Sequence, residues 1–264
     1  MRLGKDVEVL PGSPNTLIYQ GRVVIDQGGR NSSVKLNAEV QMATHGHMDH
    51  IFGLTTEAKV KYIPPQDMWA LNMIGRRAMT YGFSSPQSPL FTYDLVIGEI
   101  SLSGDPEVEI VPLPGHTPGH SGYILGSTLY AGDSFFGQKV LEGFVFPFFV
   151  DFWAALESME KLRELFKAVE NVVISHGPVY EKRKMQELLD FNVQYAGRLL
   201  KWIEDEIRGK EATSQEVTVR VMMRAGAKEV KPTNLLLNET VVKSILSVKA
   251  KEFRVSEKGL VYRG

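Results

Sequence analysis

The chain of 264 residues is 43% hydrophobic with a formal net charge of −1, which is typical of a globular protein that buries a large core without disulfides or metal ions to hold it together. It contains no cysteine, which excludes disulfides, thiolate metal ligands and a cysteine nucleophile. It also has no signal-peptide pattern and no apolar run of about 20 residues, so we expect a cytoplasmic protein without a membrane partner.

The first 180 residues alternate between strand-like and helix-like segments. Short apolar runs bounded by turn residues predict strands at 7–10, 16–20, 23–25, 40–43, 60–63, 97–102, 108–113, 122–125, 128–131 and 172–174. Helical spacing of apolar residues predicts one helix over 67–79 and another from the N-cap Asp151 to about Ala168. The segment 81–93, rich in Ser, Pro and aromatic residues, is either a lid or pocket wall or a plain connection.

The pattern changes after residue 180. Apolar residues predict a long helix over 181–208, a capping box at Thr213–Glu216 opens a second helix, and 238–251 predicts a third. Two apolar runs on either side of Ser256-Glu-Lys-Gly259 predict a terminal hairpin. We therefore expect a catalytic body of residues 1–180 and a small C-terminal helical, winged-helix-like unit of residues 181–264.

All histidines of the chain follow or lie within turn-like segments just after apolar strand runs, and they are His45, His47, His50, His116, His120 and His176. Side chains at i and i+2 point the same way at a strand end, so His45 and His47 can hold one metal ion while Asp49 and His50 reach a neighbouring one. Imidazole and carboxylate together suit zinc, manganese or iron rather than calcium.

The same arrangement recurs later in the chain. His116 follows the strand-like Val111-Pro-Leu-Pro-Gly115, Asp133 follows Leu129-Tyr-Ala-Gly132, and His176 follows Val173-Ile-Ser175. Each places a metal-binding side chain at the end of a strand, where loops gather and sites form. The sequence therefore predicts a metal centre built from strand ends.

Together these motifs resemble the metallo-β-lactamase superfamily over roughly the first 180 residues. The segment Thr44-His-Gly-His-Met-Asp-His50 matches every fixed position of the family motif T-H-x-H-x-D-H, and the later motifs follow in the family's order. The resemblance implies an α/β fold, namely the four-layer αββα sandwich of that family. It also implies two divalent metal ions, with zinc favoured and iron or manganese as alternatives.

Carried over residue by residue, the resemblance assigns the metal ligands. His45, His47 and His116 should hold the first ion, while Asp49, His50 and His176 should hold the second, with Asp133 bridging the two. Asp26, in Val24-Ile-Asp-Gln-Gly28, is expected to brace the cluster. His120 is expected to pack or hydrogen-bond beside the site rather than bind metal.

This ligand set predicts a hydrolase that uses a metal-bridging hydroxide, with Asp49 and Asp133 as catalytic residues. The favoured substrate is a small ester or thioester, as in the hydroxyacylglutathione hydrolases. An apolar pocket supports it, walled by the aromatic residues that follow Asp133, although the same residues suit core packing or a dimer contact. These residues are Phe135, Phe136, Phe144, Phe146, Phe148, Phe149, Phe152 and Trp153.

The alternative is a single-strand-specific endoribonuclease similar to the lactamase-beta-like ribonucleases. Residues 181–264 carry 17 Lys and Arg against 12 Asp and Glu, a net charge of +5, whereas residues 1–180 carry 13 against 19, a net charge of −6. A basic C-terminal segment can bind the phosphates of single-stranded RNA. A C-terminal unit of this kind can equally form the contact in a homodimer or cover a small substrate. The sequence does not identify the substrate-binding residues.

Overall fold

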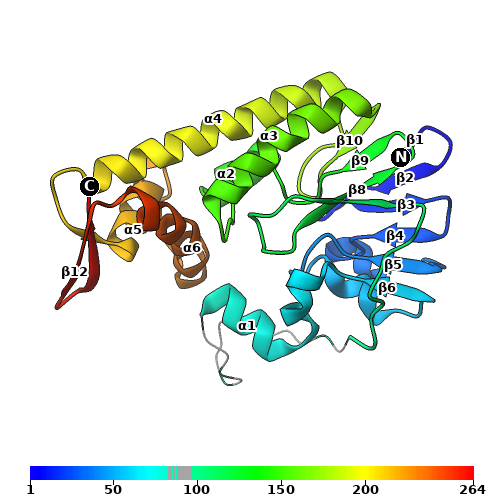
Figure 1. The fold of residues 1–264 in the computed structure, drawn as a ribbon, viewed down its shortest axis with the longest axis horizontal. Coiled ribbons are helices and arrows are strands. Elements are labelled where there is room, and N and C mark those ends of the chain that lie inside the picture. Colours follow the sequence, from blue (N-terminus) through cyan, green and yellow to red (C-terminus); the bar gives the residue numbers. More distant parts are fainter. Residues whose placement is uncertain (83–84, 86, 88–94, 96) are drawn as a thin grey trace.

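The computed structural model describes residues 1–82, 85, 87, 95 and 97–264. Its body is built on two sheets (Figure 1). The first contains, in order across the sheet, β1 (Arg2–Leu3), β2 (Val7–Leu10), β3 (Thr16–Tyr19), β4 (Val23–Ile25), β5 (Val40–Met42) and β6 (Val60–Tyr62). The second contains β10 (Asn171–Val173), β9 (Thr128–Tyr130), β8 (Ser121–Leu125) and β7 (Glu109–Pro112).

Three parallel pairings place the ends of strands side by side. β4, β5 and β6 run parallel, and β9 runs parallel to β10, whereas the other neighbours in these sheets are antiparallel. Since parallel strands end at the same edge of a sheet, the loops that follow β4, β5 and β6 gather at one place. The loops after β9 and β10 gather in the same way.

Three apolar clusters define the layers. The two sheets face each other across a buried core that includes Leu17, Ile25, Met42, Tyr123, Tyr130 and Val173. The outer face of the second sheet packs against α3 (Phe152–Ala168) and α4 (Lys182–Ile207). On the first sheet, Gln41 points away from this core toward Gly53 of the 3-10 segment η2 (Ile51–Thr55). The remaining cover comes from η1 (Gly29–Ser33), which contacts η2, and from η3 (Pro65–Leu71), against which α1 (Met73–Tyr81) packs. The predicted α/β sandwich is confirmed.

The C-terminal part continues this core. After α4 come β11 (Ala212–Thr213), α5 (Ser214–Arg224), α6 (Pro232–Lys249), β12 (Glu252–Ser256) and β13 (Gly259–Arg263). The three strands form a small sheet in the order β11-β13-β12, and the predicted capping box at Thr213 is present. Apolar side chains of α4, α5 and α6 belong to the same buried cluster as α3 and the second sheet. The boundary after residue 180 stays a prediction.

Three expectations from the sequence need correction. Residues 97–102 form no strand, because Ser101 binds Lys61 of β6 through one backbone hydrogen bond of 2.6 Å and one to its side chain instead of a ladder. The helix expected over 67–79 is split at Asn72, whose side chain accepts from the Gly75 amide and so starts α1 afresh. The short helix α2 (Gln138–Phe144) was not predicted, and α6 begins at Pro232 rather than at residue 238.

Most of the segment 81–93 lies outside the described residues, so its predicted role as a lid or wall has no structural account. In the part of the chain that the structure describes, no helix combines the length and apolarity needed to cross a membrane.

Candidate metal centre

The predicted ligands meet at one edge of the sandwich, where the ends of both sheets come together. His45, His47, Asp49 and His50 lie in the turn after β5, and His116 lies between β7 and β8. Asp133 and His176 follow the parallel strands β9 and β10, which explains why residues so far apart in sequence are neighbours.

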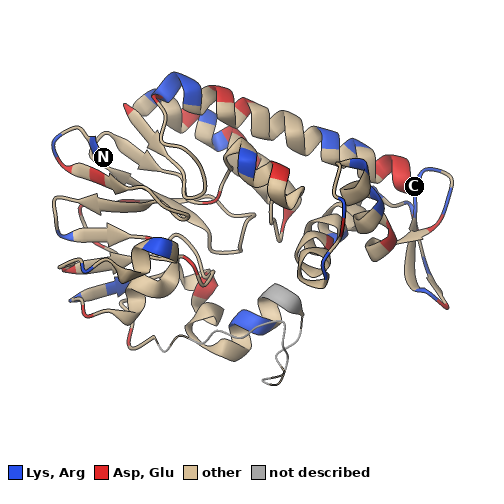
Figure 2. Cartoon of the chain, turned by 180° about the vertical axis from the view of Figure 1, so that it is seen from behind, with Lys and Arg blue, Asp and Glu red and all other residues tan. Residues whose placement is uncertain are grey.

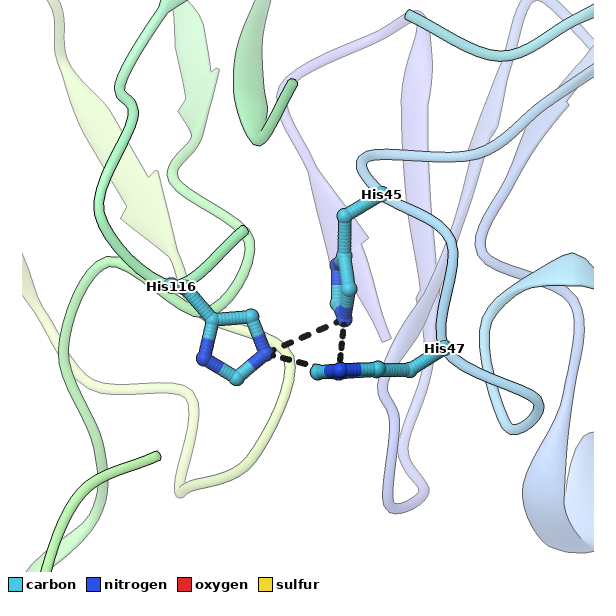
Figure 3. Close-up of side chains that lie close together, drawn as sticks. All are labelled: His45, His47 and His116. Carbon is cyan, nitrogen blue, oxygen red and sulfur yellow. Dashed lines mark hydrogen bonds between the residues drawn. The ribbon is translucent and has the colours of Figure 1, made fainter. Parts of the chain in front are cut away.

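Three histidines direct one ring nitrogen each at a common point (Figure 3). His45 Nε2 lies 2.9 Å from His47 Nδ1, and His116 Nε2 lies 3.1 Å and 3.0 Å from these two atoms. A neutral imidazole has a single N–H, so three nitrogens that face one another cannot all act as both donor and acceptor. Zinc–nitrogen bonds of about 2.0–2.1 Å in a tetrahedral site separate the donors by about 3.3 Å, close to the observed spacing. The triad therefore fits a metal ion.

A second group lies beside the triad. His50 Nε2 is 3.1 Å from His176 Nε2, and Asp49 Oδ2 is 3.3 Å from His176 Nε2 and 3.7 Å from His50 Nε2. Asp133 Oδ2 lies between the two groups, 3.2 Å from His116 Nε2, 3.6 Å from His50 Nε2 and 3.5 Å from His176 Nε2. Asp133 Oδ1 is buried without a hydrogen-bond partner among the described residues. A buried carboxylate with an unpartnered oxygen at this place fits the donor set of a metal site.

The outer ring nitrogens hold the histidines in place. His116 Nδ1 is 2.6 Å from the Phe148 carbonyl oxygen, and His176 Nδ1 is 2.6 Å from Ser13 Oγ. His50 Nδ1 lies 2.8 Å from Asp26 Oδ2. With the N–H on the outer nitrogen, the inner nitrogen keeps its lone pair for a metal.

Asp26, which the sequence predicts to brace the cluster, contacts the turn after β5. Its fully buried carboxylate accepts from the Thr44 amide and hydroxyl, each at 2.8 Å, and from the Tyr130 hydroxyl at 2.9 Å, besides facing His50. One carboxylate therefore connects the end of β4 with the turn after β5 and with β9.

His120 stands behind Asp133. Its Nδ1 donates to the Leu113 carbonyl at 2.8 Å, and its Nε2 accepts from the Asp133 amide at 2.8 Å. A Cβ added at Gly132 would lie only 2.5 Å from that Nε2, so the close approach requires glycine there. His120 thus contacts the backbone of the loop rather than the point where the other ring nitrogens converge.

The site separates neutral from charged histidines. Burial lowers the pKa of His45 and His116 well below the usual value, which keeps both neutral as metal binding requires. Burial also opposes a charge on His50, but Asp26, Asp133 and Asp49 outweigh it and raise the pKa of His50 to about 10. Although burial opposes its ionisation, Asp49 has a lowered pKa because of His50 and His176. The carboxylates thus favour positive charge at this point, which a metal ion would supply.

Most of the aromatic segment after Asp133 belongs to the core. Phe135, Phe136, Phe146, Phe149 and Phe152 are buried in the cluster beneath α3 and α4, whereas Phe144 is exposed. Phe148 is half-buried, and its ring centroid lies 5.1 Å from that of His47. Trp69, which was not predicted to be near the site, lies 6.4 Å from His47. Of the expected pocket wall, Phe148 lies beside His47 and Phe136 lies near His116. Trp153 lines a pocket with Gly115 and Thr117, the residues on either side of His116.

Asp67 is a second residue at the site that the sequence does not single out. It is fully buried and binds both turns that carry the first histidine triad. Its position five residues after β6, in a loop like those of the acids that follow β4 and β9, is the signal that could have identified it.

Comparison with known proteins identifies the family. The model of the metallo-beta-lactamase superfamily matches residues 42–177, and the chain belongs to this superfamily. A hydroxyacylglutathione hydrolase of Haemophilus influenzae is 32% identical over 117 residues, 38% of this chain and 54% of that protein. One of Shewanella baltica is 26% identical over 133 residues, 48% and 46% of the two chains. The chain thus spans about half the length of these curated relatives.

Solved structures share the fold over the whole chain. A beta-lactamase domain protein from Burkholderia ambifaria has a TM-score of 0.64 at 14% identity, covering 100% of this chain and 92% of its own. A metallo-beta-lactamase family protein from Thermus thermophilus has a TM-score of 0.61 at 18% identity, covering 98% of both.

Proposed function

We propose that this member of the metallo-beta-lactamase superfamily is a hydrolase with two metal ions that acts on a small ester or thioester. The observation that carries the proposal is the convergence of three histidine nitrogens within 2.9–3.1 Å of one another beside a carboxylate oxygen shared with a second ligand group. Such open groups of three protein ligands are typical of catalytic rather than structural metal sites.

The ligands divide between two ions. His45, His47 and His116 would hold the first, and Asp49, His50 and His176 the second, with Asp133 shared. When bound, such ions lower the pKa of a water molecule and polarise the group under attack. Zinc suits this set of imidazoles and carboxylates, and iron and manganese accept the same ligands.

Asp49 is placed to handle the proton of the attacking water. Its side chain is 44% exposed, whereas that of Asp133 is 4% exposed, so of these two carboxylates Asp49 is the one open to a substrate. In hydrolysis, the water oxygen bonds to the acyl carbon and the carbon–sulfur or carbon–oxygen bond breaks. Asp49 would accept the water proton, and the leaving thiol or alcohol would take up a proton in turn.

The surroundings of His47 favour an acyl substrate with an apolar part. Trp69 and Phe148 both lie beside the ring of His47, and both are half-buried. Aromatic side chains in this position bind apolar groups through contact with their faces. The relatives from Haemophilus influenzae and Shewanella baltica are named for hydrolysis of an acylated glutathione, which supports a thioester within this class.

The ribonuclease alternative receives less support from the charges. In residues 181–264, ten of the 17 Lys and Arg form ion pairs with acids of the same segment. Figure 2 shows basic and acidic residues interleaved along this part of the chain. Cations already paired with carboxylates contribute less to binding phosphates, so the net charge of the tail overstates its affinity for RNA.

The test combines metal analysis with a substrate panel. Purified protein would be assayed for bound metal and then incubated with an acyl-glutathione thioester, an activated ester and end-labelled single-stranded RNA. Asp49→Asn should abolish hydrolysis, whereas Asp6→Asn, at an exposed aspartate outside the site, should retain it. RNA cleavage by the wild type without ester or thioester turnover would replace the proposed substrate class, and a chain that binds no divalent metal would refute the proposal.

A further inference from the structure

We infer that Asp67 is a positioning residue that locks together the two turns carrying the first histidine triad and thereby sets the affinity of that triad for its metal ion. The inference rests on the proposed metal centre. It assigns to Asp67 a role in assembling the site, with no direct contact to metal or substrate.

The carboxylate of Asp67 bonds to two separate segments of the chain. Its Oδ2 accepts from the Gly46 amide at 2.9 Å and from the Thr117 hydroxyl at 2.5 Å, and its Oδ1 accepts from the Gly119 amide at 2.8 Å. Gly46 lies between His45 and His47, and Thr117 directly follows His116. One side chain therefore links the turn after β5 in the first sheet with the turn between β7 and β8 in the second.

This link matters because the triad is assembled from both turns. Two of its nitrogens come from the first turn and one from the second, and they must converge to within 3.1 Å. A relative shift of the turns by a few tenths of an ångström would change every metal–nitrogen distance on one side of the site. Second-layer groups of this kind typically contribute about 10–100-fold to metal affinity.

The packing around Asp67 leaves no room for side chains at the two residues whose backbone amides bond to its carboxylate. A Cβ added at Gly119 would lie 2.8 Å from Asp67 Oδ1, and one added at Gly46 would lie 2.5 Å from the Ala70 Cβ. Both glycines thus permit the backbone amides to reach the carboxylate. The hydrogen bonds to Asp67 therefore depend on glycine at both positions.

The three donors also explain why the residue is an acid. A carboxylate offers two acceptor oxygens, whereas an asparagine of the same shape offers one oxygen and an NH2 group. In Asp67→Asn the NH2 group must face either Gly119 or the pair Gly46 and Thr117, so at least one buried donor loses its partner. The variant therefore perturbs the link without removing side-chain volume.

The effect should be selective for one of the two ions. Asp26 bonds to His50 in the second group. Among the described residues, the Asp67 carboxylate bonds instead to the Gly46 amide, between His45 and His47, and to the segment that follows His116. Loss of the Asp67 carboxylate is therefore expected to lower the affinity for the first ion and to leave the affinity for the second nearly unchanged.

The experiment compares Asp67→Asn and Thr117→Val with the control Asp105→Asn. Asp105 is also buried, and its carboxylate binds Arg22 away from the site. The affinities for both zinc ions would be measured by competition with a chromophoric chelator, with the absorption spectrum of the cobalt-loaded protein as a probe of geometry. The melting temperature of the metal-free protein reports on the structural cost.

We expect Asp67→Asn to bind one of the two ions about 10–100-fold more weakly and to alter the cobalt spectrum. Thr117→Val should act in the same direction with a smaller change, and Asp105→Asn should leave both affinities unchanged even where it lowers the melting temperature. Unchanged zinc affinities in Asp67→Asn together with a lower melting temperature would make the role purely structural and overturn the inference. If Asp67→Asn does not fold, unchanged affinity in Thr117→Val overturns it. A wild type that binds no metal would instead refute the proposed function, before any variant is compared.

Discussion

The stability of the metal-free protein should have a maximum near pH 6.5, because its buried histidines titrate in opposite directions. The pKa of His50 is raised from 6.5 to about 10. Its contribution to the unfolding free energy is therefore fully present below pH 6.5 and is lost as pH rises toward 10. The pKa values of His45 and His116 are lowered, so below pH 6.5 these residues bind protons in the unfolded chain but not in the folded chain. The unfolding free energy therefore falls as the pH falls below 6.5. Stability therefore declines on both sides.

His50 sets a lower limit on the alkaline slope, because the carboxylates of Asp133 and Asp49 also raise the pKa of His176 against the effect of its burial. One proton bound by the folded chain and not by the unfolded chain changes the unfolding free energy by about 1.4 kcal/mol per pH unit. Between pH 6.5 and pH 9.5 the metal-free protein should lose about 4 kcal/mol. Asp26 is the nearest carboxylate, at 2.8 Å from His50 Nδ1, so Asp26→Asn should reduce this slope markedly.

Urea unfolding of chelator-treated protein at several pH values, followed by tryptophan fluorescence, measures the effect. Asp105→Asn is a suitable control, since Asp105 has a lowered pKa because of its bond to Arg22 and does not titrate in the alkaline range. A wild type equally stable at pH 6.5 and pH 9.5 would refute the reasoning. So would an Asp26→Asn variant that keeps the full alkaline slope.

Three further predictions follow from the site and the core. His47→Ala or Asp133→Ala should abolish hydrolysis and weaken metal retention, as measured by metal analysis after dialysis, and full activity in Asp133→Ala would contradict the two-metal assignment. Phe148→Ala should raise KM for a substrate with a bulky apolar acyl group more than for an acetyl ester, and an equal change for both would contradict its role as a wall. Leu189→Ala, at a fully buried position of α4, should lower the unfolding free energy by about 2–5 kcal/mol in urea titrations, and the same change at the half-buried Leu200 should cost clearly less.

The regular elements were predictable where a local pattern decides the structure. The Asp151 cap of α3 and the capping box at Thr213 both lie where the sequence places them, because caps depend on residues within one turn. The predictions from sequence are wrong where tertiary contacts determine the local structure. Residues 97–102 have the apolar content of a strand, yet Ser101 uses its side chain as well as its backbone to bind β6.

The predicted ligands share a property that Asp67 lacks. Each ligand lies in the turn that follows a strand, within a short recognisable motif, so its role is predicted from a few neighbouring residues. Asp67 has its partners 21, 50 and 52 residues away, at Gly46, Thr117 and Gly119. Only the folded arrangement of both sheets brings them together, and in sequence Asp67 fits the first turn of a helix equally well.

Helix α4 supports the loop that carries Asp133 as well as the core. Asn192 of α4 is buried, accepts from the Phe136 amide at 3.0 Å and donates to the Phe136 carbonyl at 2.8 Å. Phe136 lies three residues after Asp133, so α4 holds the far side of the loop whose near side is held by His120. The loop that carries Asp133 therefore depends on side chains from both sides of residue 180, from His120 and from Asn192.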